Sequence, residues 1–316
     1  MSQIIKISVV APFFNEGDGV THFYREMCSI FASLSQYDFE LVCVDDGSSD
    51  DTLSYLIELA NTDNRVKVIE FSRNFGKEAA LTAGIDYATG GAVIPIDSDL
   101  QDPPELIGEM IELWRSGAEV VLAKRVDRSS DTALKRMTAS AFYRIHNLLS
   151  SETLIPENVG DFRLMDRVVV DALKRLPERQ RFMKGLFAWV GFKTKTLEYV
   201  RSARIAGETK FSGWRLWNFA LEGITSFSLL PLKVWTYFGL IGAFFAFFYA
   251  LYIIIRTLIF GVDLPGYASL LVVSLFFGSL QLISLGILGE YIGRIYFESK
   301  QRPLYIVRKS HGQSQA

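Results

Sequence analysis

The sequence lacks the short motifs that define several common enzyme classes. It contains no GxxxxGK[ST] loop, no HExxH and no pair of CxxC motifs, which excludes P-loop NTPases, zincin metalloproteases and zinc ribbons. Cysteine is scarce, with two in 316 residues, and the three histidines are scattered along the chain. We therefore interpret Cys28 and Cys43 as reduced core residues on the cytoplasmic side and assign no role to any histidine.

Charge is also missing from two long stretches near the C-terminus. Residues 234–255 and 264–289 contain no Asp, Glu, Lys or Arg. A helix rises about 1.5 Å per residue, so either stretch exceeds the roughly 30 Å of a bilayer's hydrocarbon core. We predict two transmembrane helices, and the alternative is a pair of buried core helices.

The net charge of −2 hides an asymmetry between the two parts of the chain. Acidic residues predominate up to residue 200 and basic residues after it. The connector between the two uncharged stretches carries only Arg256 and Asp263, whereas basic residues flank both stretches on their outer sides. The positive-inside rule therefore predicts that both termini face the cytoplasm. The apolar run at 4–14 is short and is interpreted as a first strand rather than a cleavable signal.

Strand-like and helix-like segments alternate over the first 125 residues. Apolar runs at 4–14, 39–45, 66–72, 91–97 and 118–125 are separated by helical patterns near 19–35, 52–61, 77–88 and 105–116. This alternation favours a parallel α/β sheet, whose ligands bind beyond the carboxyl ends of the strands. From 129 to 160 the pattern is helical and polar, and the next strand is predicted only within "FKTKTLEYVRSARI".

Two carboxylates follow the strand "GAVIPIDSD" directly. Asp97 and Asp99 are two residues apart, so in an extended segment both side chains point to the same side and repel each other. A divalent cation relieves that repulsion, and Mg²⁺ prefers one or two carboxylates with water and substrate phosphates completing its shell. We favour a metal site here, the alternative being a solvated turn.

A second acidic pair, Asp45 and Asp46, ends another predicted strand and leads through a Gly-Ser-Ser turn into a helix. Carboxylates in this position accept hydrogen bonds from the ribose or base of a nucleotide. The alternative is that this turn supplies only the N-cap of the following helix. Together with Asp97 and Asp99, the pair is predicted to lie along one rim of the sheet.

Positive charge that could meet phosphates is clustered rather than spread evenly. An Arg side chain binds phosphate through a planar fork, which suits a pyrophosphate or a lipid phosphate. Each basic residue taken alone could equally be an ordinary surface charge. The candidates are Arg73, Lys77, Lys124, Arg125, Arg128, Lys135, Arg136, Arg201, Arg204 and Lys210.

The chain divides into four predicted parts. Residues 1–210 form a cytosolic catalytic domain, 233–290 two transmembrane helices with a short non-cytoplasmic loop, and 291–316 a cytosolic basic tail. Between them, residues 211–232 are rich in aromatic side chains and poor in charge. Trp214 and Trp217 suit the headgroup level, so we interpret this segment as an interfacial amphipathic helix, with an ordinary domain helix as the alternative.

Several of these segments, taken together, form the motif pattern of a known family. "SVVAPFFNE", "VDDGSSDDT", "RNFGKEAALTAG", "PIDSDLQDPPE", "VLAKR", "GDFRLM" and "AGETKF" occur in this order, and "GILGEYIGRIY" follows the second uncharged stretch. The chain resembles the family 2 GT-A glycosyltransferases of the polyprenyl-phosphate type, which include dolichol-phosphate mannose synthase-like enzymes. With "FMKG" and "ALEGITSFS" it looks most like the bactoprenol glucosyltransferases of phages and prophages. The resemblance covers nearly the whole chain.

This resemblance implies a GT-A fold, Rossmann-like with a mostly parallel sheet, and an inverting transfer of glucose from UDP-glucose to undecaprenyl phosphate. The reaction would take place on the cytoplasmic face of the bacterial inner membrane and would supply a lipid-linked glucose for O-antigen modification. It also implies Mg²⁺ or Mn²⁺ as cofactor and a homo-oligomer, a tetramer in relatives, with Gly278, Gly286 and Gly289 as packing positions. No nucleic acid partner is expected. Another nucleotide sugar, of the mannose or amino-arabinose type, is the alternative donor.

The resemblance also carries roles onto matching residues. Metal binding falls on Asp97, Asp99 and Gln101, and a catalytic role on Asp161 and Asp99. Donor binding is implied for Pro12, Asn15, Glu16, Asp45, Asp46, Lys77, Asp97, Arg204 and Lys210, and binding of the acceptor phosphate for Arg125, Lys135 and Arg136. Ser98 departs from the Ala or Val that relatives often carry, and we expect little effect because its side chain should point away from the metal.

Two other functions are compatible with some of these features. A processive polysaccharide synthase uses a similar sheet and metal motif, but it needs several more spans and usually a QxxRW motif, which this sequence lacks. A membrane carrier or flippase is disfavoured because two helices without charges inside the membrane make a poor path for a polar substrate.

Overall fold

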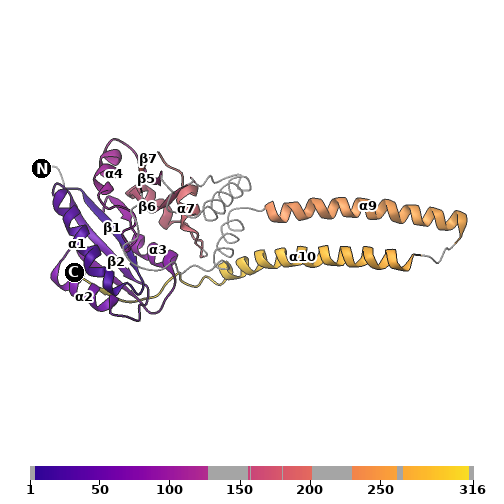
Figure 1. Ribbon diagram of the computed structural model, residues 1–316, viewed down its shortest axis with the longest axis horizontal. Helices are drawn as coiled ribbons and strands as arrows, with labels where there is room; N and C mark the ends of the chain where they lie inside the picture. The colour runs from indigo at the N-terminus through magenta and orange to yellow at the C-terminus, as the bar shows by residue number, and fades with distance from the viewer. Residues whose placement is uncertain are drawn as a thin grey trace.

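The computed structural model describes residues 4–126, 156, 158–179, 181–200, 230–261 and 266–312. These residues form an α/β domain and two long helices that extend from it side by side (Figure 1). After the second long helix, the chain returns to the domain and adds a strand to its sheet.

The first half of the domain alternates strands and helices, as the sequence predicts, and the predicted helices are found within a few residues of their expected bounds. Its elements are β1 (Lys6–Phe13), α1 (Gly17–Ser33), β2 (Asp38–Asp45), α2 (Thr52–Thr62), β3 (Val66–Phe71), α3 (Lys77–Tyr87), β4 (Ala92–Pro95), α4 (Leu106–Arg115) and β5 (Val120–Arg125).

The second half completes one eight-stranded sheet in the order β7-β5-β6-β4-β1-β2-β3-β8. Its elements are β6 (Val159–Asp166), α6 (Arg167–Lys174), α7 (Met183–Trp189), β7 (Thr194–Tyr199) and β8 (Val307–His311). β1 pairs in parallel with β2 and β4, β2 with β3, and β5 with β7, whereas β6 and β8 run antiparallel to their neighbours. The predicted GT-A-like α/β fold with a mostly parallel sheet is therefore confirmed.

Apolar side chains cover both faces of the sheet, as expected for central parallel strands. Successive residues of β1 alternate between the two faces, so that Val9 packs into one core layer and Val10 into the other. Helices α1, α2 and α4 contribute to the first layer, and α3, α6 and α7 to the second. With both faces closed, polar side chains of the central strands gather at the strand ends.

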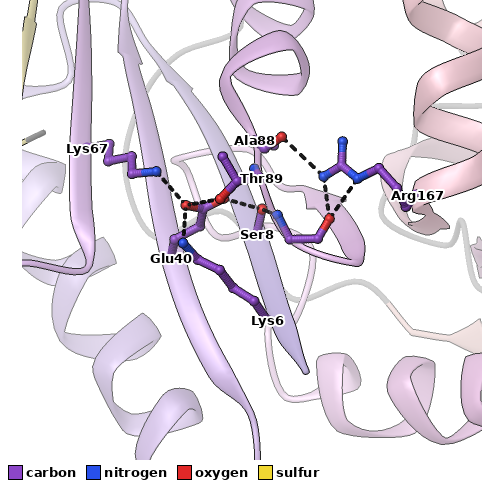
Figure 2. A network of polar contacts seen from close by, with 8 residues as sticks. Lys6, Ser8, Glu40, Lys67, Ala88, Thr89 and Arg167 are labelled. Carbon is purple, nitrogen blue, oxygen red and sulfur yellow. Dashed lines mark hydrogen bonds and ion pairs between the residues drawn. The ribbon is translucent and has the colours of Figure 1, made fainter. Parts of the chain in front are cut away.

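One such polar cluster surrounds Glu40 near the amino ends of β1, β2 and β3 (Figure 2). The Glu40 carboxylate accepts hydrogen bonds from Ser8 Oγ at 2.5 Å and from Thr89 N at 2.6 Å. Its Oε2 atom also pairs with Lys67 Nζ at 2.7 Å and with Lys6 Nζ at 2.9 Å. Burial opposes the charge, but these donors outweigh it and lower the pKa of Glu40 to about 2. The cluster joins three strands to the turn before β4.

The central strand β6 was not predicted, because the sequence pattern indicates a helical, polar segment up to residue 160 and no strand before residue 192. The structure places Val159–Asp166 between β4 and β5. Phe162 and Leu164 fill one core layer, as a strand requires. On the opposite face Asp161 and Arg163 interrupt the apolar alternation, and this hides the strand signal.

The segment predicted as a basic tail, 291–316, contains more regular structure than a tail. It includes the last turns of the second long helix and then β8, which pairs with β3 at the edge of the sheet. Before β8, the Tyr305 ring stacks on Phe71 with centroids 5.1 Å apart, and the Tyr305 hydroxyl donates to Asp86 Oδ2 at 2.9 Å. The C-terminal segment is thus part of the catalytic domain's sheet.

The two long helices are α9 (Leu230–Phe260) and α10 (Tyr267–Ser299). Within the described part of the chain, one segment, Val272–Ser299, has the length and apolar composition needed to cross a membrane, and no residue of its apolar 18-residue part is buried. This segment contains most of the second predicted span, whereas the first corresponds to the shorter apolar stretch Tyr237–Tyr249. The predicted interfacial helix lies outside the described residues, apart from 230–232, which begin α9.

Candidate active site

The carboxyl ends of β1, β2 and β4 meet at one edge of the sheet because these three strands are parallel. Asp45 is the last residue of β2 and lies beside Phe13 at the end of β1. Asp97 follows β4 by two residues, and Ile96 N still donates to Val10 O on β1. The predicted acidic rim is therefore present, at the edge opposite the Glu40 cluster.

Lys77, the first residue of α3, joins two carboxylates from different parts of the chain. Its Nζ atom lies 2.7 Å from Asp97 Oδ1 and 3.0 Å from Asp161 Oδ2. Burial disfavours the ammonium, but the Asp161 and Asp97 charges outweigh it and raise the pKa of Lys77 above its usual value. Three residues that the sequence analysis singled out separately are thus brought into one charged cluster.

Asp161 enters this cluster from β6, the strand that the sequence did not predict. Burial opposes its charge, but the ammonium groups of Lys77 and Lys184 outweigh that effect and lower the pKa of Asp161 to about 2. Its Oδ1 atom is buried and has no hydrogen-bond partner among the residues that the structure describes. Asp161 therefore holds a fixed negative charge and one oxygen that is able to accept a hydrogen bond from a ligand.

The segment after Asp97 forms a tight turn rather than an extended strand. Leu100 adopts the left-handed region with φ of 49°, and Leu100 N donates to Asp97 O at 3.3 Å. The Gln101 side-chain amide then donates to Asp99 Oδ2 at 2.7 Å. In this arrangement Gln101, a predicted metal ligand, holds and orients the Asp99 carboxylate.

The donors at this rim fit a divalent cation. Burial raises the pKa of Asp97, and the Asp161 and Asp99 charges add to this increase while Lys77 opposes it, so negative charge is in excess here. Among the described residues, no three His, Cys, Asp or Glu side chains form a complete metal cage. Such a partial set suits Mg²⁺ or Mn²⁺, which share their shell with water and substrate phosphates.

Asp45 and Asp46 close the rim on the side of β2. Asp46 accepts the backbone N–H groups of Phe75 at 2.6 Å and Gly76 at 2.9 Å, which fixes the turn before α3. Asp45 Oδ2 accepts a hydrogen bond from Ser48 N at 3.2 Å, while its Oδ1 atom is buried and has no partner within the described part of the chain. Burial raises the pKa of both carboxyl groups. Asp46 thus has a structural task, whereas Asp45 keeps an oxygen for a ligand.

Pro12, Asn15 and Glu16 lie at the end of β1 and in the turn after it, close to the β2–α2 turn. Asn15 has a φ of 54°, its N–H donates to Ser48 Oγ at 3.0 Å, and its Oδ1 accepts Ser49 N at 2.8 Å. Glu16 N donates to Thr52 Oγ1 at 2.9 Å. These contacts join the two turns into one wall beside Asp45. The Asp50 carboxylate accepts hydrogen bonds from Thr52 N at the start of α2 and from Gly17 N at the start of α1, so it also links the two turns.

Arg125, predicted to bind the acceptor phosphate, ends β5 and is engaged by two residues that the sequence analysis did not single out. Its Nη2 atom donates to Asp102 Oδ1 at 3.2 Å, and its Nε atom donates to the Tyr199 hydroxyl at 3.0 Å. The Tyr199 hydroxyl in turn donates to Asp102. This triad connects the segment that carries Asp97 and Asp99 with β5 and β7. Two donors of Arg125 are thus used within the protein.

Two further side chains near Asp161 were missed from the sequence. Glu78, next to Lys77, is half-buried, and its Oε2 atom accepts a hydrogen bond from Met183 N at 3.0 Å. Burial, followed by the Asp161 charge, raises the pKa of Glu78 to about 7. Lys184 follows Met183 on α7. The available signals were the second charge beside Lys77 in "GKEA" for Glu78, and a single lysine among apolar residues in "FMKG" for Lys184. The predicted site residues Lys135, Arg136, Arg204 and Lys210 lie outside the described residues.

Comparison with known proteins identifies the family of the chain. The glycosyl transferase family 2 profile matches residues 8–174, which include the whole rim. The chain is 56% identical over 307 residues to an SfII prophage-derived bactoprenol glucosyl transferase of Shigella flexneri, covering 97% of this chain and 99% of the relative. It is 55% identical over 305 residues to a prophage bactoprenol glucosyl transferase homolog of Escherichia coli K12, covering 96% and 99%.

Among solved structures, glucosyl-3-phosphoglycerate synthase from Mycobacterium tuberculosis, in complex with Mn²⁺, UDP-glucose and phosphoglyceric acid, is similar with a TM-score of 0.47 and 19% identity. The similarity covers 71% of this chain and 78% of that one. The family profile spans more than half of the chain, and the two sequence relatives cover nearly all of it. The chain is therefore a glycosyltransferase and belongs to glycosyl transferase family 2.

Proposed function

We propose that this enzyme transfers glucose from UDP-glucose to undecaprenyl phosphate at the cytoplasmic face of a bacterial inner membrane. The observation that carries the proposal is the Lys77, Asp97 and Asp161 cluster beyond the parallel strands, with one buried Asp161 oxygen left for a ligand. The names of the relatives at 56% and 55% identity support bactoprenol as the lipid and glucose as the sugar. Another nucleotide sugar on the same site is the alternative.

The acceptor needs little activation. A phosphate monoester has its second pKa near 6, so it is largely a dianion at neutral pH and can attack without a strong general base. One of its oxygens forms a bond to C1 of the sugar while the bond from C1 to the diphosphate breaks, and UDP leaves with the electron pair. The configuration at C1 is inverted. Catalysis then depends mainly on positioning the two substrates in line.

Each residue of the rim has a proposed task in this step. Asp45 accepts a hydrogen bond from the nucleoside through its unpartnered oxygen, and the wall that contains Pro12, Asn15 and Glu16 supports it. Asp97 and Asp99 hold the divalent cation, with Gln101 orienting Asp99. That cation, when bound, stabilises the negative charge on the departing diphosphate. Arg204 and Lys210 remain predicted partners of the same diphosphate.

Asp161 is proposed to orient the sugar or the acceptor rather than to remove a proton. With a pKa of about 2 it is ionised throughout the physiological range, and a group this acidic is a weak base. Its free oxygen accepts a hydroxyl hydrogen of the bound sugar, while Lys77 fixes the other oxygen. Arg125, Lys135 and Arg136 remain predicted contacts of the acceptor phosphate.

Membrane attachment fits a lipid acceptor whose phosphate lies at headgroup depth. We propose that α9 and α10 both span the membrane, that both termini are cytoplasmic, and that residues 211–232 hold the domain at the surface. Arg179 N donates to Glu298 Oε1 at 2.8 Å, which fixes the end of α10 to the domain. If a protein ending at residue 210 still glycosylated a long-chain lipid normally, this arrangement would be wrong. A homo-oligomer also remains a proposal.

The reaction is tested by incubating purified protein with undecaprenyl phosphate, MgCl₂ and a panel of labelled nucleotide sugars, and following label into the organic phase. We expect label from UDP-glucose, and we expect EDTA or Asp99→Ala to abolish it. Label from a different sugar alone would keep the reaction and change the donor. No label from any sugar would contradict the proposed acceptor.

A further inference from the structure

A cavity of about 190 Å³ lies between α7 and the part of the sheet formed by β5 and β6. Leu122, Val159, Phe187 and Phe192 give it an apolar wall, and Lys184 is one of two basic residues that line it. On β6, side chains two residues apart share a face, so Val159 in the cavity wall and Asp161 in the active site lie on the same side of the sheet. The cavity therefore adjoins the candidate active site.

Lys184 differs from the other cations near Asp161 in how it is paired. Lys77 is bound to Asp97 and Asp161, and Arg125 is bound to Asp102. Within the described residues, no carboxylate forms an ion pair with Lys184, although its charge acts on both Asp161 and Glu78. Its positive charge is thus available to an anionic ligand at the cavity.

The second basic residue of the cavity, Arg163, has other contacts. It is 5% exposed, its guanidinium lies 4.0 Å from the centre of the Phe187 ring, and its Nη2 atom donates to Gly160 O at 2.6 Å. These contacts build the cavity floor and hold the β6 backbone beside Asp161. Arg163 is accordingly a support of the cavity, and Lys184 is its half-exposed cation.

The position of Lys184 is fixed from the active site itself. Met183 N at the start of α7 donates to Glu78 Oε2, and Met183 Sδ accepts the Thr82 hydroxyl at 3.6 Å. Glu78 directly follows Lys77 on α3. The first turn of α7 is therefore attached to the same helix that provides Lys77, so Lys184 and the catalytic cluster keep a constant relation.

We propose that Lys184 binds the phosphate of the acceptor, and that the apolar wall of its cavity receives the first isoprene unit of the lipid. An ammonium group is a suitable point charge for a phosphate dianion. The cavity greatly exceeds the roughly 30 Å³ that one water occupies, and its aromatic and aliphatic wall suits a hydrocarbon. This inference rests on the proposed function, because it assigns a site to that reaction's acceptor.

Steady-state kinetics with farnesyl phosphate and UDP-glucose test the lysine. We expect Lys184→Gln to raise the KM for the acceptor at least about tenfold, as befits a lost charge-assisted contact, and to leave the KM for UDP-glucose within twofold. Lys184→Arg should recover part of the loss. Lys309→Gln removes the same charge from exposed β8, at the far edge of the sheet, and should change neither constant. An unchanged acceptor KM, or a raised donor KM instead, would overturn the proposal.

A binding measurement separates this inference from the reaction. Calorimetry with the wild-type protein compares farnesyl phosphate, farnesol and inorganic phosphate, without any donor. We expect the phosphate ester to bind most tightly and Lys184→Gln to abolish its advantage over farnesol. If the wild-type protein prefers the ester and the variant keeps that preference, the inference fails while the proposed function stands. If the wild-type protein itself shows no preference, the proposed acceptor is wrong.

The apolar wall has its own variant. Ala188 lines the cavity from α7, and Ala188→Phe would fill much of the space without removing a charge. We expect it to weaken the binding of farnesyl phosphate at least about fivefold, because the isoprene unit loses its apolar contacts, while the binding of inorganic phosphate stays unchanged. Equal affinity of wild type and variant for farnesyl phosphate would exclude the chain from this cavity.

Discussion

Two acidic clusters lie at opposite ends of the same parallel strands, and they differ in how completely their charges are paired. Around Glu40, at the amino ends, both carboxylate oxygens have partners, including two lysines (Figure 2). The result is a pKa of about 2 for Glu40, although burial opposes the charge. This cluster is complete as it stands, and its consequence is stability.

In the cluster at the carboxyl ends, by contrast, not every carboxylate oxygen has a hydrogen-bond or ion-pair partner among the described residues. One ammonium, that of Lys77, serves both Asp97 and Asp161, and one oxygen each of Asp161 and Asp45 is buried without a partner. Burial raises the pKa of Asp97 and Asp45. Such unpaired polar atoms cost stability and persist where a ligand completes them. The comparison teaches that the pairing state separates the carboxylates proposed to act in the reaction from the structural one.

The largest expected effect comes from Asp97→Asn. Loss of a carboxylate that holds the metal should lower kcat/KM for UDP-glucose at least about a hundredfold. The stability of the fold should not decrease together with the activity, because the substitution relieves the repulsion of Asp97 with Asp161 and Asp99. We expect the Tm in EDTA to be unchanged or a few degrees higher, measured by scanning fluorimetry in detergent. A marked fall in Tm would place Asp97 with Glu40 among the structural carboxylates.

Glu40→Gln should give the opposite result. The amide still accepts from Ser8 and Thr89, but it leaves Lys67 and Lys6, which are partly exposed, without a counter-charge. Losing charge-assisted hydrogen bonds of this kind costs about 1.5–3 kcal/mol, which corresponds to a fall in Tm of roughly 3–12 °C for a domain of this size. The kcat at a temperature well below the Tm should match the wild type. A loss of kcat without a loss of Tm would show that the network reaches the active site.

The Glu40 cluster also predicts a dependence of stability on pH. The pKa of Glu40 is about 2 in the folded protein against an ordinary value of 4.5, so its charge stabilises the fold fully above pH 4.5. That contribution should disappear as the pH falls from about 4.5 toward 2. The difference in Tm between wild type and Glu40→Gln should therefore be constant from pH 6 to 8 and shrink in acid. A difference that stays constant down to pH 3 would contradict the assigned pKa.

Much of the first half of the fold was predictable from sequence because local pattern and tertiary environment agree there. β1 and β2 are apolar and buried on both faces, and the helices that follow them, α1 and α2, begin where polar turns end. The rim followed from topology alone, since parallel strands bring Asp45 and Asp97 to one edge. The turn after β2 depends on Gly47, which has a φ of 68° and lies so close to the Arg73 backbone that a Cβ atom would clash with it.

The remainder depended on contacts between distant residues. β6 escaped prediction because Asp161 and Arg163 occupy the positions where an apolar alternation would show a strand. The same two residues are polar for a reason that only the structure reveals, namely their contacts with Lys77 and Phe187. β8 escaped because a basic edge strand has little apolar signal of its own. The Asp102 and Tyr199 contacts of Arg125 come from three separate segments, and no spacing rule relates them.

The smallest expected effect belongs to an ion pair that is neither buried nor at the rim. Lys124 Nζ lies 3.2 Å from Glu198 Oε1, and both side chains are about half exposed, so solvent screens the attraction. Glu198→Gln should change stability by less than about 0.5 kcal/mol and leave the acceptor KM unaltered. Lys124 is next to Arg125 in sequence, so this variant tests whether the acceptor phosphate depends on the charges around the end of β5. If it altered acceptor binding as strongly as Lys184→Gln, the acceptor phosphate would depend on the Lys124–Glu198 pair as much as on Lys184, and the specific role of Lys184 would be wrong.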